Sequence, residues 1–183
     1  LHRRRHSFPT RRSSDLSVDI QRGLDDFELH AGITYLDNEP LTHVRSRPLY
    51  QERYVLLTAR GRGLDDRAAI GWAEAAKLPL CLLVPEMQNR RIVNAAFAAA
   101  GCQPTPVVET DSVAALVSHV RETGLVAIAP DRLAERLGLG ADLVPVRLEA
   151  PDLVHTVGLV VPDREPAPPF VAALWEAARA AGA

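Results

Sequence analysis

The chain has 183 residues, a formal net charge of −2 and 47% hydrophobic residues, a composition typical of one globular domain or two small subdomains. Its apolar runs are far shorter than the roughly 20 residues needed to cross a bilayer, and no apolar segment follows the arginine-rich start as in a secretory signal. Two cysteines do not make a disulfide scaffold, so we expect a reduced, cytoplasmic setting and no membrane partner.

The first sixteen residues, LHRRRHSFPTRRSSDL, differ in charge from everything that follows. They carry five arginines and one aspartate, so the remainder of the chain is acidic. Nucleic-acid binding needs clustered positive charge, which that remainder lacks. We expect residues 1–16 to be a disordered or non-native leader; a basic arm for nucleic acid is the alternative.

The next segments alternate between helix and strand. Residues 17–24 predict a short helix, and 28–35, with the alternating sequence ELHAGITY, predict a strand. A second strand is predicted over 53–59 and a brief helix over 70–76. The apolar run PLCLLV at 79–84, bounded by prolines, indicates a buried parallel strand.

The central part contains the clearest helical signals. A helix is predicted over 87–100, where apolar residues recur at helical spacing before Gly101. A short strand at 105–109 precedes a second helix over 113–122, which Asp111 or Ser112 can cap at its start and Gly124 at its end.

The C-terminal part continues the alternation. We expect a buried strand at 125–129, a helix at 131–137, strands at 143–148 and 155–161, and a final helix at 170–180. Strands that alternate with helices predict an α/β fold with mostly parallel sheets.

Catalytic and cofactor motifs are absent from the sequence. It has no GxSxG elbow, no Walker loop and no metal-ligand spacing among its six histidines, and Gly61-Arg62-Gly63 lacks the third glycine of a dinucleotide loop. We therefore expect no enzymatic activity, no catalytic residue, no metal and no cofactor.

Two strand-to-helix junctions could hold a ligand. Strand 79–84 leads directly into Gln88, Asn89, Arg90 and Arg91 at a helix start, where free N–H groups and polar side chains suit a small anion. The segment Glu109-Thr110-Asp111-Ser112 forms the second junction, and ligands of open α/β sheets bind beyond such strand ends. The alternative is that these residues are only helix caps and exposed polar positions.

The order of several segments resembles the effector-binding domain of LysR-type transcriptional regulators. GLDDFELHAGI at 23–33 is similar to the family's "GL..GELDLAI" entry, and PLYQERYVLL at 48–57 is similar to its "PL..E.LVLV" crossover. The pieces 97–101, 109–112 and 120–130, the last ending GLVAIAP, resemble its "F...G", "E..S" and "V..G.GIAILP" markers. The resemblance covers 17–182, with one glycine of the usual G.G pair missing before Leu125.

The resemblance implies a periplasmic-binding-protein-like (type II) fold of two Rossmann-like subdomains around an effector cleft. Subdomain I would comprise about 17–57 and 131–182, and subdomain II about 58–130. The family's opening strand and helix of the effector domain would be missing before residue 17, so that subdomain I would be incomplete and Ala31, Ile33 and Leu159 left uncovered. Carried over by position, the ligand-binding residues would be Thr34, Tyr35, Gln88, Asn89, Thr110 and Asp111, with Arg90 or Arg91 supplying positive charge.

The implied function is effector sensing and dimerisation within a DNA-binding regulator. The partners would be a small, anionic metabolite and a second copy of the chain in a homodimer or higher homo-oligomer. DNA would bind only through a winged helix-turn-helix that this chain lacks. A free-standing solute-binding protein of the same fold is the first alternative, although it would need an export signal, and a small-molecule enzyme is the second.

Overall fold

The computed structural model describes residues 16–38, 40–136 and 142–181. The expected leader lies outside these residues, except for Leu16, which begins the first helix. The helices are α1 (Leu16–Asp25), α2 (Trp72–Ala75), α3 (Gln88–Ala99), α4 (Val113–Thr123), α5 (Asp131–Arg136) and α6 (Pro169–Ala181). The strands are β1 (Gly32–Tyr35), β2 (Val44–Ala59), β3 (Ala69–Gly71), β4 (Leu80–Leu83), β5 (Val108–Thr110), β6 (Val126–Pro130), β7 (Leu143–Glu149) and β8 (Val154–Pro162).

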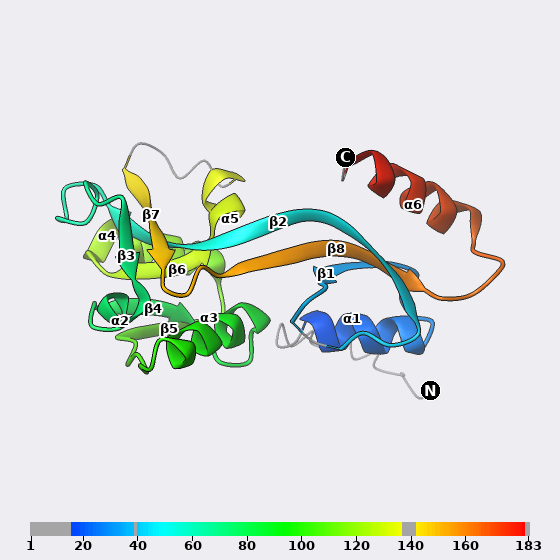
Figure 1. Ribbon diagram of the computed structural model, residues 1–183, viewed down its shortest axis with the longest axis horizontal. Coiled ribbons are helices and arrows are strands. Elements are labelled where there is room, and N and C mark those ends of the chain that lie inside the picture. The colour runs from blue at the N-terminus through cyan, green and yellow to red at the C-terminus, as the bar shows by residue number, and fades with distance from the viewer. Residues whose placement is uncertain (1–15, 39, 137–141, 182–183) are drawn as a thin grey trace, which may run out of the picture.

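The 16-residue strand β2 runs through both halves of the molecule (Figure 1). Its residues 44–53 pair antiparallel with β8, and its residues 54–59 pair antiparallel with β6 and β7. The main sheet order is β1-β8-β2-β6-β4-β5. Among the described strands, the pairs β4·β5, β4·β6 and β3·β7 are parallel and the other four pairs are antiparallel, so the expectation of mostly parallel sheets is wrong. The sheet is mixed, since the chain crosses between the halves and returns on a neighbouring strand.

The first half consists of β1, β8 and the beginning of β2, with one helix on each face. Ile20 and Leu24 of α1 bury Val160 on one face, and α6 covers Leu159 on the other. Leu159 is therefore buried, contrary to the expectation that it would lie open. Ile33 is 57% exposed on the edge strand β1 and Ala31 is half-buried; that they lack a covering neighbour stays a prediction.

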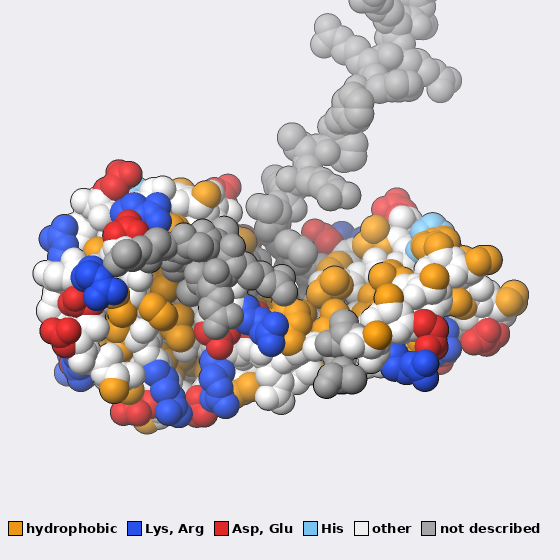
Figure 2. Space-filling view, turned by 90° about the horizontal axis from the view of Figure 1, so that it is seen from above, with side chains coloured by type: hydrophobic (Ala, Val, Ile, Leu, Met, Phe, Trp, Pro, Cys, Tyr) orange, Lys and Arg blue, Asp and Glu red, His pale blue; other side chains and the backbone are white. Residues whose placement is uncertain are grey.

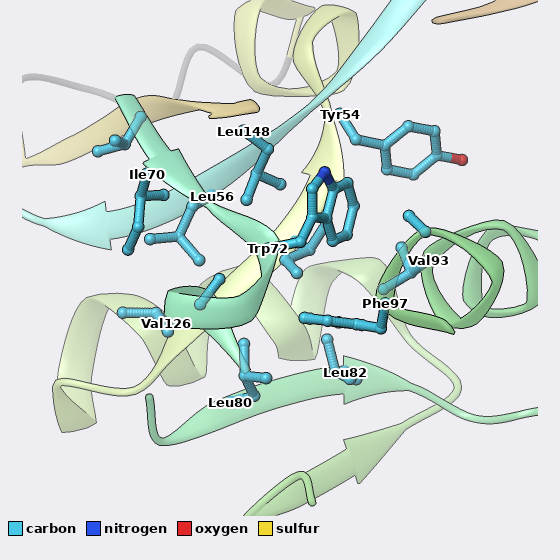
Figure 3. Close-up of a cluster of buried hydrophobic side chains, with 14 of the residues drawn as sticks. Tyr54, Leu56, Ile70, Trp72, Leu80, Leu82, Val93, Phe97, Val126 and Leu148 are labelled. Carbon is cyan, nitrogen blue, oxygen red and sulfur yellow. The ribbon is translucent and has the colours of Figure 1, made fainter. Parts of the chain in front are cut away.

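The second half contains two hydrophobic clusters, one on each face of the sheet. Side chains alternate along β4, so that Leu80 and Leu82 join the cluster beneath α2 and α3, whereas Cys81 and Leu83 join the cluster beneath α4. Figure 3 shows the first cluster, with the Trp72 ring at its centre. The two faces are thus sealed by different helices.

Strand β7 lies in this second half, beside β3 and residues 55–59 of β2. The subdomain I predicted from the sequence includes about 131–182, and within the described part of that range β8 and α6 pack in the first half. The strand pairing leads us to propose a boundary after β7, with 131–149 belonging to the second subdomain.

Most predicted helices form where their local signals lie. The Oγ atom of Ser112 accepts a hydrogen bond from the Ala115 N–H at 3.3 Å, and Gly124 ends α4 with a φ of 77°. Two strands differ in length, since β2 begins nine residues earlier than expected and 28–35 contributes only the strand Gly32–Tyr35. The expected helix at 70–76 splits into β3 and α2.

The surface seen from above has no single charged face; acidic and basic side chains are interspersed over the lobe that contains β7 (Figure 2). Hydrophobic side chains gather on the opposite lobe, where Phe170 and Leu174 of α6 are exposed. No described helix combines the length and apolar character that a bilayer crossing requires.

Candidate ligand site between the two halves

A cleft of about 260 Å³ lies where the two halves of the sheet meet. Its walls come from β1, β2 and β8 and from the segment that begins α3. The lining residues are Ile33, Thr34, Tyr35, Tyr50, Glu52, Met87, Gln88, Asn89 and Val157. A ligand in this cleft would contact both halves at once.

The structure brings four of the predicted ligand residues into this lining. Thr34 and Tyr35 come from the end of β1, and Gln88 and Asn89 come from the first turn of α3. These pairs are more than fifty residues apart in sequence, and they meet because β2 carries the chain from one half to the other.

Arg90 lies elsewhere, and its side chain is only 8% exposed. Its Nη1 donates to the Leu83 carbonyl at 2.5 Å and to Oε1 of Glu109 at 2.7 Å, while its Nε donates to Oδ1 of Asn94 at 2.8 Å. The bonds to Leu83 and Glu109 connect α3 to β4 and β5 inside the second half, and the bond to Asn94 lies within α3. The guanidinium is thus engaged within the protein and does not line the cleft.

The remaining predicted residues also lie outside the lining. The Thr110 hydroxyl accepts a hydrogen bond from the Ser112 N–H at 3.1 Å in the turn before α4. Asp111 is exposed in the same turn, and Arg91 donates to the Glu86 carbonyl at 2.9 Å. The Thr110 and Ser112 side chains of this junction make the hydrogen bonds of a turn and a helix cap, and a ligand role for Thr110 and Asp111 stays a prediction.

Five of the described lining residues were not predicted as ligand residues from the sequence, and Glu52 is the only acidic one among them. It lies on β2, is 6% exposed, and accepts a hydrogen bond from the Tyr35 hydroxyl. The Tyr35 and Tyr54 hydroxyl oxygens lie 3.1 Å apart, and Tyr54 donates to Oδ1 of Asn89. This polar series of Glu52, Tyr35, Tyr54 and Asn89 connects β1, β2 and α3. The period-two alternation of 52, 54 and 56 along a strand was the signal that could have revealed it.

The surroundings of the polar series favour its uncharged forms. Burial raises the pKa of Glu52 above its ordinary range, and the nearby Asp131 adds to this, although the bond from Tyr35 and the charges of His155 and Arg132 act in the opposite direction. Burial also raises the pKa of both tyrosines, so their hydroxyls stay protonated at any physiological pH. The cleft therefore holds a carboxyl group whose ionisation is costly.

A second polar pair holds the end of β1 against β8. Nδ1 of His155 and Oδ1 of Asp37 are 2.9 Å apart, and the Thr156 N–H donates to Oδ2 of Asp37 at 2.9 Å. Although burial acts to raise it, these hydrogen bonds lower the pKa of Asp37 overall. The His155 ring meets the Tyr35 ring edge-on at 5.6 Å, which helps to orient the tyrosine in the cleft.

We expect the variant Glu52→Gln to be more stable than the original chain at neutral pH. Because the folded-state pKa of Glu52 is raised, its contribution to stability is complete below the ordinary carboxyl pKa and is lost as pH rises through the folded value. Glutamine keeps an acceptor for Tyr35 but cannot ionise. Urea unfolding from pH 4 to pH 8 should show a stability gain that grows with pH, and a gain equally large at pH 4 would contradict the assignment.

Metal binding and cysteine reactivity are the other chemistry to consider among the described residues. They contain no group of three or more His, Cys, Asp or Glu side chains placed to hold a metal ion. Burial raises the pKa of the Cys81 thiol, and Cys102 packs against the cluster on the other face of the sheet. The two thiols therefore lie on opposite sides of β4.

Solved structures of other proteins share this architecture. None of the curated proteins matches the sequence. Among solved structures, the reduced OxyR regulatory domain from Pseudomonas aeruginosa is 21% identical, with a TM-score of 0.74 over 90% of this chain and 79% of that one. The CcmR regulatory domain from Synechocystis PCC6803, in complex with 2-PG, is 11% identical, with a TM-score of 0.78 over 90% and 78%.

A full-length relative shows how much of such a protein the chain spans. CbnR complexed with its target DNA is 17% identical, with a TM-score of 0.72, and the match covers 91% of this chain but 55% of CbnR. At these identities the likeness establishes the fold, which is the periplasmic-binding-protein-like arrangement of two subdomains. The sequence itself matches the model of the LysR substrate binding domain over residues 10–183. The chain therefore belongs to the LysR substrate binding domain family.

Proposed function

We propose that this chain is the effector-sensing part of a LysR-type transcriptional regulator, and that its effector is a small molecule bound in the cleft between the two halves. The observation that carries the proposal is the convergence of Thr34, Tyr35, Gln88 and Asn89 on one cleft at the junction crossed by β2. The complex of the CcmR regulatory domain with 2-PG supports a small ligand. The role is binding, not catalysis.

The signal would be a change in the relative orientation of the two halves. A ligand that contacts both β1 and α3 stabilises the orientation in which both contacts are made, and it shifts the population by its difference in affinity for the two states. The Tyr35 and Tyr54 hydroxyl oxygens, 3.1 Å apart, already join β1 of the first half to the part of β2 in the second half, and this contact belongs to one such orientation.

The partners follow from the same proposal. We assign to the effector an anionic group that meets the positive end of α3 beside Gln88 and Asn89. We further propose a homodimer or higher homo-oligomer in the cytoplasm, and DNA contact through another part of the regulator, as the DNA complex of CbnR suggests. The alternative, a free-standing solute-binding protein, would be favoured if no helix-turn-helix is encoded in frame with this domain.

The double variant Gln88→Ala/Asn89→Ala tests the cleft. We expect the original chain, incubated with a metabolite extract and desalted, to retain a small molecule in native mass spectrometry. The double variant should bind that molecule at least tenfold more weakly, since each lost hydrogen bond to a charged group contributes about 1.5–3 kcal/mol. Calorimetry with the identified molecule measures the difference.

The matched control is Gln103→Ala, which removes an exposed amide outside the cleft. It should bind like the original chain. If the double variant bound the retained molecule with unchanged affinity, the cleft would not be the effector site.

A further inference from the structure

The cleft contains an acidic side chain where an anion site should contain a basic one. Among the described residues that line it, Glu52 is the only one with a carboxylic acid side chain, and none is a lysine or an arginine. Arg90, the cation expected there, is bonded to Glu109 and Leu83 within the second half. The lining therefore does not match a ligand that is purely anionic.

The Glu52 carboxylate is only partly satisfied by the protein. Oε1 accepts from the Tyr35 hydroxyl, while Oε2 accepts no hydrogen bond from any residue that the structure describes, although the side chain is more than nine-tenths buried. Nearby charges come from Asp131 and Arg132 on α5 and from His155 on β8, and none of them is hydrogen-bonded to this carboxylate within the described chain. Oε2 is not one of the fully enclosed atoms that lack a partner, so it is accessible in the cleft, where a ligand can supply the donor.

The opposite wall has the complementary character. α3 begins at Gln88, so the positive end of this 12-residue helix meets the cleft. Oδ1 of Asn89 is used by Tyr54, which leaves the Nδ2 amino group to donate. The polar series of Glu52, Tyr35, Tyr54 and Asn89 contains three contacts, which at ordinary hydrogen-bond lengths span at most roughly 9 Å. The hydrogen-bond acceptor Glu52 and the donors at the start of α3 therefore lie on opposite walls of the same small cleft.

We propose that the effector is a small zwitterion, an amino carboxylate, whose ammonium group binds Glu52 and whose carboxylate binds at Gln88 and Asn89. This inference rests on the proposed function and specifies the chemistry of its ligand. The ammonium supplies the donors that Oε2 of Glu52 lacks, and Tyr35 and Tyr50 provide aromatic lining for the cation. Arg132 lies 4.4 Å from the Tyr50 ring centre and outside the lining, where it offsets part of the site's negative charge.

Single-charge ligands fit this site less well. A carboxylate without an amine would occupy the same short space as Glu52 and would be repelled by it, or would require its protonation. An amine without a carboxylate would satisfy Glu52 but leave the α3 end and Nδ2 of Asn89 without an anionic acceptor. Discrimination should therefore depend on both ends of the ligand.

Calorimetry at pH 7.5 on the 183-residue chain tests the inference with three matched sets of probes. These are the protein-forming amino acids, the same carboxylic acids without the amino group, and the same amines without the carboxylate. We expect at least one amino acid to bind, and its two truncated analogues to bind at least tenfold more weakly.

The variant Glu52→Gln should weaken binding of that amino acid ten- to hundredfold, because a charge-assisted contact is replaced by a neutral one. It should leave binding of the truncated carboxylic acid unchanged or improve it. The matched control Glu122→Gln removes an acidic charge from the exposed face of α4 and should alter neither affinity. Because glutamine preserves the acceptor for Tyr35, a weaker affinity can be separated from misfolding by an unchanged or raised melting temperature.

The outcomes distinguish this inference from the proposed function. If a truncated carboxylic acid binds as tightly as its amino acid and the double variant Gln88→Ala/Asn89→Ala weakens it, the cleft is an effector site but the zwitterion assignment is wrong. If no amino acid binds, or if Glu52→Gln binds it equally well, the assignment is likewise overturned. If ligands bind without any effect of the double variant, the proposed function fails as well.

Discussion

Replacing Trp72 by alanine should lower the free energy of unfolding by about 3–5 kcal/mol, the usual cost of removing a large buried aromatic side chain. Trp72 is fully buried at the centre of the cluster beneath α2 and α3, where its ring meets Phe97 edge-on at 5.0 Å. Its Nε1 also donates to the Pro151 carbonyl at 2.9 Å, and that acceptor would lose its partner. Since domains of this size have only about 5–15 kcal/mol of stability, the variant should be close to unfolding at 37 °C.

Urea denaturation followed by circular dichroism measures this loss. The matched control is Phe170→Ala, which removes an aromatic ring that is 56% exposed on α6 and should cost less than about 1 kcal/mol. Equal losses for the two variants would show that the Trp72 cluster is not the core of the second half.

Replacing Arg90 by alanine should cost about 1.5–3 kcal/mol of stability, because three hydrogen bonds from a buried cation are lost together. The lower end of this range applies because Glu109, its ionic partner, is 41% exposed and can be rehydrated. The Leu83 carbonyl is buried, so it cannot be rehydrated in the same way. Chemical unfolding measures the loss, and ligand affinity per folded molecule should not change, since Arg90 does not line the cleft.

Arg22→Ala is the control for this variant, because its ion pair with Asp19 is exposed on α1 and should contribute less than about 0.5 kcal/mol. If Arg90→Ala lost ligand affinity while its stability was unchanged, Arg90 would be a ligand-binding residue and the prediction would be wrong.

The segments with strong local signals were predictable from sequence. The run of apolar residues in β4 and the capped helix α4 formed where expected, because a buried run and a Ser112–Gly124 pair of caps act within a few residues. Gln88 and Asn89 could be placed at a strand-to-helix junction for the same reason, and the structure puts both in the lining of the cleft; their binding of a ligand stays a prediction.

The long strand β2 could not be read in the same way. Its first half is polar and contains Pro48, a residue that argues against a strand interior. In the structure, Pro48 lies beside a shift in register with β8 that precedes Tyr50, where a proline is tolerated. With the strand unrecognised, the shared face of Glu52 and Tyr54 was unrecognised too, and so was the charge of the site.

The pairing of β2 with β8 has a mechanical consequence. Only β2 passes from one half to the other as an unbroken strand, and up to the boundary it pairs with β8, so that Tyr50 faces Val157 and Glu52 faces His155. Rotation of one half against the other must therefore twist β2 at the end of this ladder, because no loop interrupts β2 between the halves, whereas the return from β7 to β8 runs through residues 150–153. Tyr50, Glu52 and Val157 all line the cleft, so a bound molecule would rest on the segment that undergoes the torsion. Binding and movement would then share the same few peptide units, and the stiffness of this ladder would set how much rotation a given binding energy can produce.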